Sequence, residues 1–206
     1  MTNEIELKLS ISPADAARFL THPLLQSSSI KQRLRLISVY YDTPALALMH
    51  QRAALRVRMA GTRWIQTIKI GGQAINGMHS RPEWEVELAD QQPQPDLFTE
   101  PLVTQLLSAE LTQQLTPVFQ TDFWRDTWLI DFHGAKIEVA LDQGKIISLA
   151  QDAPICEVEL ELKQGDAQQL TELAQLLGQD ITLTPDSISK AQRGYTLYQN
   201  QISTSS

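Results

Sequence analysis

The residues of this chain that could do chemistry are ionised side chains at every second position, with apolar residues between them. In a β-strand, such alternation puts one kind of side chain on each face. The pattern occurs in six segments, which are 4–9, 56–58, 67–70, 81–87, 138–142 and 157–163. Their charged faces carry both signs in clusters, and this composition suits a polyanion that is bound through divalent metal.

Carboxylates lie close together in the first and last of these segments. Glu4 and Glu6 share one face, and so do Glu157, Glu159 and Glu161. Like charges this close repel one another unless a cation or a base lies between them. A single alternating segment is ordinarily a half-solvated strand of an antiparallel sheet. For the whole set we favour a closed barrel with a charged lumen, whose apolar outer face is covered by helices.

Length and composition indicate one domain, which we place at 1–200. The chain has 206 residues, of which 42% are hydrophobic, and a net charge of −7. This charge argues against a broad basic surface for nucleic acid. The single cysteine, Cys156, argues against a disulfide framework and suits a reducing compartment, so we expect a cytoplasmic protein. No apolar run approaches the roughly 18 residues of a membrane-spanning helix, so we expect no membrane partner.

The elements that must position the charged residues are strands with peripheral helices, an α+β arrangement. The predicted strands are 3–10, 33–42, 52–60, 63–70, 82–88, 120–132, 135–142, 145–149 and 155–163. The predicted helices begin after Ser12, cover about 96–115 and 166–177, and begin again after Pro185 with Asp186 or Ser187 as the cap. Turns are predicted at Gly134 and at 142–144. Residues 201–206 are expected to form a disordered tail.

The segment Glu4-Ile5-Glu6-Leu7-Lys8 resembles the Glu-x-Glu-x-Lys signature that opens the CYTH superfamily, the triphosphate tunnel metalloenzymes. Eight further segments resemble that family in the same order, so the resemblance extends over residues 4–195. They are 40–43, 55–58, 67–69, 81–85, 121–125, 137–144, 156–161 and 189–195. The likeness is closest to bacterial inorganic triphosphatases, in which a helical CHAD domain follows the catalytic domain. We expect that second domain to be absent from this chain.

This resemblance implies an eight-stranded antiparallel tunnel that hydrolyses inorganic triphosphate to diphosphate and phosphate. Arginine gives planar, bidentate contacts to phosphate oxygens, and lysine gives a point charge. The implied substrate-binding residues are Lys8, Arg56, Arg58, Lys69, Arg81, Arg125, Lys190 and Arg193, with Arg81 the weaker candidate. A surface salt bridge is the alternative role for each of these cations.

The same resemblance implies two divalent ions, Mg²⁺ or Mn²⁺, because these hard cations prefer oxygen ligands. The implied metal ligands are Glu4, Glu6, Glu157 and Glu159, with Asp142 and Glu161 as additions. The implied catalytic residues are Glu4, Glu6, Lys8 and Glu159. One ion would orient the phosphates and the other would activate a water. The alternative role for Glu83, Glu85 and Glu87 is to balance the arginines.

Other functions remain open from the residues alone, because a fold does not fix a function. Adenylate cyclases and thiamine or nucleoside triphosphatases use the same fold. A non-catalytic polyphosphate-binding module is a third class, although anion binding alone gains nothing from clustered glutamates. Gly71-Gly72 lacks the Lys-Ser/Thr pair of a P-loop, and the four histidines show no metal-ligand spacing.

Overall fold

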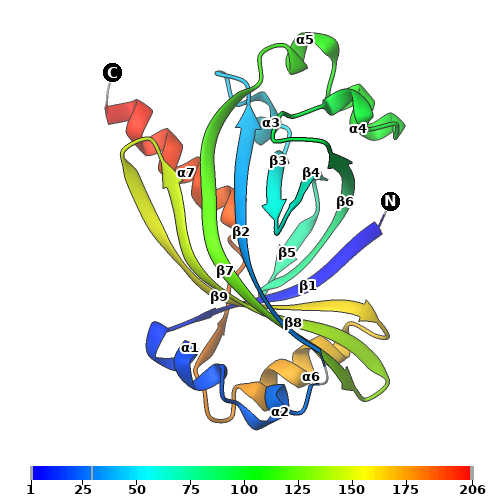
Figure 1. Ribbon diagram of the computed structural model, residues 1–206, viewed down its shortest axis with the longest axis vertical. Helices are drawn as coiled ribbons and strands as arrows, with labels where there is room; N and C mark the ends of the chain where they lie inside the picture. The colour runs from blue at the N-terminus through cyan, green and yellow to red at the C-terminus, as the bar shows by residue number, and fades with distance from the viewer. Residues whose placement is uncertain (1, 29, 205–206) are drawn as a thin grey trace.

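The computed structural model describes residues 2–28 and 30–204, and its main feature is a closed, wholly antiparallel barrel (Figure 1). The strands around the ring are, in spatial order, β1 (Thr2–Ile11), β9 (Gln151–Gln164), β8 (Ala135–Ser148), β7 (Thr116–Phe132), β2 (Lys31–Asp42), β3 (Ala53–Ala60), β4 (Arg63–Ile70) and β6 (Met78–Leu88). Pairing of β1 with β6 closes the ring. Two short strands, β5 (Gln73–Ile75) and β10 (Leu183–Pro185), pair with β6 and β1. The eight-stranded barrel with helices packed outside it is therefore confirmed.

One group of helices covers the outer face of β1, β7, β8 and β9. The group consists of α1 (Pro13–Phe19), α2 (Pro23–Gln26) and α6 (Gln168–Leu177), at the lower end of Figure 1. Trp128, Phe19 and Leu170 are fully buried between these helices and the sheet. The apolar half of the alternating pattern therefore makes the outer core, which leaves the charged half for the lumen.

A second group covers β3, β4 and β6. It consists of α3 (Ala47–His50), the 3-10 turn η1 (Pro95–Leu97), α4 (Pro101–Leu106) and α5 (Ala109–Thr112), which pack around Leu55, Ile68 and Val103. The prediction of one helical region over 96–115 was too coarse. Pro101 starts a new helix, because proline fits the first turn. Ser108 then caps another by accepting a bond from the amide of Leu111.

The last helix, α7 (Lys190–Thr204), packs against β7, β8 and β9. Ser189 and Gln192 cap it reciprocally, since each side chain bonds to the other residue's amide. The predicted caps, Asp186 and Ser187, were therefore placed too early. We expected a disordered tail over 201–206, but the helix continues through Thr204, and Gln201 donates to the carbonyl of Ser148. Residues 205–206 lie outside the described part of the chain.

The β7–β8 hairpin corrects one prediction and confirms another. Gly134 lies in the turn at a φ of 85°, as expected. The turn predicted at 142–144 does not exist, because β8 continues through it and Gly144 pairs with Phe123 on β7. A Cβ at Gly144 would lie 2.2 Å from the carbonyl oxygen of Asp122, so glycine serves close strand contact there. Within the described residues, no helix has the length and apolarity to cross a membrane.

Candidate active site: a charged tunnel

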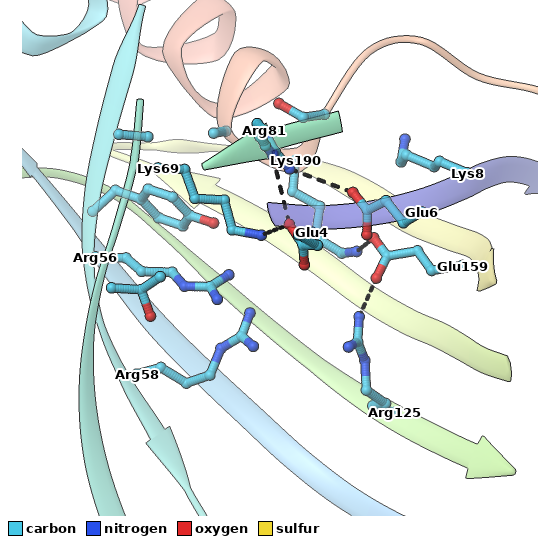
Figure 2. A pocket seen from close by; sticks show the side chains of 15 residues that line it. Glu4, Glu6, Lys8, Arg56, Arg58, Lys69, Arg81, Arg125, Glu159 and Lys190 are labelled. Carbon is cyan, nitrogen blue, oxygen red and sulfur yellow. Dashed lines mark hydrogen bonds and ion pairs between the residues drawn. The ribbon is translucent and has the colours of Figure 1, made fainter. Parts of the chain in front are cut away.

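The barrel encloses a cavity whose walls carry both signs of charge (Figure 2). Seven ring strands and α7 contribute to it because alternate residues of each strand point inward. Ten of the fourteen predicted site residues line it, and they are Glu4, Glu6, Lys8, Arg56, Arg58, Lys69, Arg81, Arg125, Glu159 and Lys190. The open space is about 70 Å³, room for a few water molecules, because ion-paired side chains fill the lumen. A larger ligand must therefore replace some of these ion pairs.

Three carboxylates converge on one lysine at the α7 side of the tunnel. Oxygens of Asp142, Glu157 and Glu159 lie within 4.8 Å of one another. The ammonium of Lys190 lies 2.6 Å from Asp142 and 2.8 Å from Glu159, and it also contacts Glu157. Arg125 forms a bidentate pair with Asp142 at 2.7 Å and contacts Glu159. Burial alone would raise the pKa of Glu159, but Lys190 and Arg125 hold it well below its ordinary value.

A second acidic group lies on β1, beside the first. Glu6 is 6% exposed, and its best cationic partner is Arg81 at 3.4 Å. Burial, followed by the charges of Glu159 and Glu4, raises the pKa of Glu6 to about 7. Glu161 pairs with Glu6 across the sheet, but its side chain contacts Lys163 at 2.7 Å and does not line the cavity. Burial raises the pKa of Glu161 as well. Glu6 is therefore short of positive charge, whereas Glu161 is paired with Lys163.

On β3, an arginine rather than a carboxylate is short of opposite charge. Figure 2 shows Arg56 and Arg58 pointing into the cavity from the wall opposite the glutamates. Arg58 donates to Ser38 at 2.9 Å and, among the described residues, forms no ion pair with a carboxylate. Burial, and then the charges of Arg56 and Arg125, lower the pKa of Arg58 to about 10. The buried Nε of Arg56 also has no hydrogen-bond partner in the described part of the chain.

The lysines of β1 and β4 and the arginine of β6 are more fully paired. Lys69 contacts Glu4 and lies 2.7 Å from Glu83, while Arg81 lies 3.8 Å from Glu4 and has a buried, unpartnered Nε. Lys8 is 1% exposed and is held by Glu157 at 3.1 Å and by Asp186 at 2.5 Å. The ammonium of Lys8 therefore already has carboxylate partners within the protein.

The acidic residues of β6 form ion pairs with arginines. This is the alternative role that the sequence left open for them. Glu83 lies between Lys69 and Arg56, at 3.7 Å from the latter. Glu85 lies 3.9 Å from Arg56. Glu87 is paired outside the cavity with Arg63 at 3.1 Å.

One predicted cation does not reach the cavity, and several neutral residues that do were not predicted. Arg193 pairs with Glu157 at 3.2 Å and donates to the carbonyl of Pro154.

Tyr40 lines the cavity, and although burial opposes the change, the charges of Arg56 and Arg58 lower its pKa. The sequence signal for Tyr40 was its place in the two-residue alternation of β2. The charge pattern could not select it, because tyrosine is neutral.

The acidic residues fit a divalent metal. They offer only carboxylate oxygens, which are ligands for hard cations. Asp142, Glu157 and Glu159 already converge within metal-ligand distance of a common point, and Glu4 and Glu6 lie on the neighbouring strand. The raised pKa of Glu6 shows that this neighbouring group gains from added positive charge.

Comparison with known proteins agrees with this geometry. An inorganic triphosphatase from Haemophilus influenzae is 38% identical over 206 residues, covering 99% of this chain but 57% of that protein. The chain thus spans somewhat more than half of that relative's length.

Two solved structures share the fold. One, from Hippeastrum, is described as a candidate adenylyl cyclase with a dominant triphosphatase activity (TM-score 0.68, 16% identity, 96% of each chain). The other, from Bacillus halodurans, is described as a candidate adenylate cyclase (TM-score 0.61, 20% identity, 92% of this chain and 96% of that one). The CYTH domain matches residues 2–195. Because that match extends over nearly the whole chain, the protein belongs to the CYTH family.

Proposed function

We propose that this chain hydrolyses inorganic triphosphate to diphosphate and phosphate, with Mg²⁺ or Mn²⁺ as the metal. The identity of 38% to an inorganic triphosphatase supports the substrate. The family and the carboxylate cluster support the use of a metal. A cytoplasmic location belongs to the same proposal and is supported by the single, unpaired Cys156.

The observation that carries this proposal is the separation of charge inside one cavity. Arg58 is a buried cation with no carboxylate partner among the described residues, and Arg56 keeps a buried Nε without a hydrogen-bond partner, whereas Glu6 on the opposite wall is a carboxylate short of positive charge. A folded protein holds such groups at a cost unless a ligand completes them. A chain of phosphates with bound divalent metal supplies negative charge to one wall and positive charge to the other.

The cations fall into groups with different proposed roles. In our proposal, Arg56 and Arg58 bind phosphate oxygens directly, because their guanidinium groups point into the lumen. Lys69 and Arg81 join them once phosphate replaces Glu4 as a partner. Arg125 and Lys190 both line the cavity and contact Glu159, so each can bridge phosphate and the carboxylates. Lys8 and Arg193 support the wall through Glu157.

The carboxylates would hold the metal, and we propose two ions. Glu4, Glu6, Glu157 and Glu159 are the main candidate ligands, with Asp142 and Glu161 as additions. A bound divalent ion supplies neutralisation of phosphate charge and a water of lowered pKa for in-line attack on a terminal phosphorus. Lys190 would then exchange carboxylate contacts for phosphate contacts, because its ammonium lies among three of these oxygens.

A substrate panel tests the proposal. We would measure phosphate release from inorganic triphosphate, ATP and thiamine triphosphate, each with Mg²⁺, Mn²⁺ or excess chelator. We expect inorganic triphosphate to be hydrolysed fastest and the activity to disappear in chelator. Faster turnover of ATP or of thiamine triphosphate would favour the nucleotide or thiamine alternatives. Binding without turnover of any of the three would favour the polyphosphate-binding module.

A further inference from the structure

A buried carboxylate outside the tunnel links three parts of the fold. Asp42, at the end of β2, is fully buried and accepts hydrogen bonds from the amides of Thr43, Leu48 and Met49 at 2.7, 2.9 and 2.9 Å. A fourth bond, at 3.0 Å, comes from the hydroxyl of Tyr195 on α7. The three amides already fix α3, so the fourth bond has a separate effect, which is to tie α7 to the barrel wall.

The rest of the contact of α7 with β2 and β7 is apolar, whereas Arg193 and Gln201 bond the helix to β9 and β8. Gly194 lies against the ring of Phe119 so closely that a Cβ there would lie 2.2 Å from a ring carbon. The ring of Tyr195 meets Phe119 edge-on, with centroids 5.1 Å apart. Such packing sets the distance of the helix from the sheet, but it resists rolling and sliding weakly, because apolar contacts are non-directional. On the side of α7 that faces β2 and β7, the hydrogen bond from Tyr195 to Asp42 supplies this direction.

The orientation of α7 determines where Lys190 points. Lys190 is the first residue of the helix, and its ammonium contacts with Asp142 and Glu159, at 2.6 and 2.8 Å, tolerate little displacement. Burial and the adjacent Asp42 raise the pKa of Tyr195, so its hydroxyl stays protonated and can donate. The hydroxyl touches neither the phosphate path nor the carboxylate cluster.

We propose that Tyr195 is a positioning residue, whose hydroxyl bond to Asp42 orients α7 so that the ammonium of Lys190 lies between Asp142, Glu157 and Glu159. The cap made by Ser189 and Gln192 holds the backbone before Lys190, so loss of the hydroxyl loosens the lysine without releasing the helix. The placement of Lys190 is independent of the proposed function. Its consequence for tripolyphosphate binding rests on that function.

The first experiment measures the placement without any substrate. Brief treatment with acetic anhydride, followed by mass spectrometry, reports the exposure of each lysine. Lys190 should react slowly, with the exposed Lys136 and Lys145 as internal references. Tyr195→Phe should raise the rate at Lys190 about fivefold, as expected for loss of a hydrogen bond worth about 1 kcal/mol. Tyr198→Phe removes a hydroxyl three residues along the same helix and should leave the rate unchanged. Equal protection of Lys190 in wild type and Tyr195→Phe would overturn the proposal.

The second experiment asks whether the hydroxyl acts through Lys190. Tyr195→Phe should weaken tripolyphosphate binding about fivefold in the wild-type background and not at all in Lys190→Met, with dissociation constants measured by calorimetry. The loss of thermal stability from Tyr195→Phe should remain in both backgrounds. Equal weakening of binding in both would show that Tyr195 acts on its own and would overturn the proposal. A wild-type protein that does not bind tripolyphosphate would refute the proposed function, and the acetylation rates would still decide this inference.

Discussion

The ammonium of Lys190 lies 2.6 Å from the carboxylate of Asp142, a side chain with no exposed surface. The same ammonium contacts Glu157 and Glu159, so one cation bridges three carboxylates, which Arg125, Lys8 and Arg193 also contact. A buried carboxylate without a cation costs several kcal/mol of folding free energy. The ammonium therefore gives the cluster part of the positive charge that a metal ion would otherwise have to provide.

Replacing Lys190 should make stability depend on metal. In chelator, Lys190→Met should lower the free energy of unfolding by about 3–5 kcal/mol, because it leaves buried carboxylates short of positive charge. Mg²⁺ should restore most of that loss, as a ligand that binds the folded state. Urea unfolding with chelator and with Mg²⁺ measures both values. The control, Lys136→Met at an exposed site, should change stability by less than about 0.5 kcal/mol. An identical loss with and without Mg²⁺ would argue against metal binding at this cluster.

The raised pKa of Glu6 predicts the pH dependence of stability in chelator. Its folded pKa is about 7 and its ordinary value is 4.5, so between these values the folded state binds more protons than the unfolded state. The free energy of unfolding should therefore fall as pH rises from 4.5 to 7. Glu6→Gln removes this titration and should be more stable than wild type at pH 8, on the order of 2–3 kcal/mol, but no more stable at pH 4.5. Parallel pH profiles for the two proteins would contradict the assignment.

The alternating charges predicted the barrel and its lumen because strand periodicity is local. Glu4, Arg56 and Glu159 each lie at inward positions of their strands, and residue spacing is enough to establish this. The partners of each charge could not be predicted, since they depend on which strands close the ring. Lys190 and Arg193 were both expected to bind the substrate, yet only Lys190 lines the cavity. The contacts of α7 with the barrel wall decide between them, and these contacts join distant parts of the sequence.

The turn wrongly predicted at 142–144 has a specific physical origin and gives a third prediction. Gly144 looks like a turn residue, but its role is to let β8 approach β7. Gly144→Ala would place a Cβ 2.2 Å from the Asp122 carbonyl oxygen and 2.4 Å from the Phe123 Cα, and backbone cannot yield as a side chain can. We expect a loss of about 3 kcal/mol or more in unfolding free energy. Gly134→Asn is the control, because that site is open and asparagine tolerates positive φ. Similar stabilities of the two variants would contradict this role.

The last prediction concerns Arg58, where stability and binding should change in opposite directions. Arg58 is a buried cation whose pKa is lowered to about 10 by burial and then by Arg56 and Arg125. Arg58→Met keeps the length of the side chain and removes the charge, so the free energy of unfolding should be unchanged or higher by about 1 kcal/mol.

Arg58→Met should also bind tripolyphosphate more weakly than the wild type, because the planar donor group is lost. Tripolyphosphate at a hundredfold excess over its Kd should stabilise the wild-type protein by about 2.7 kcal/mol. Arg58→Met should lose most of this gain, whereas Arg63→Met, which removes an exposed arginine paired with Glu87, should keep it. Sulfate at equal ionic strength distinguishes specific binding from screening. If sulfate stabilises the wild-type protein as much as tripolyphosphate does, or if Arg58→Met keeps the full gain, then Arg58 does not bind the phosphate chain.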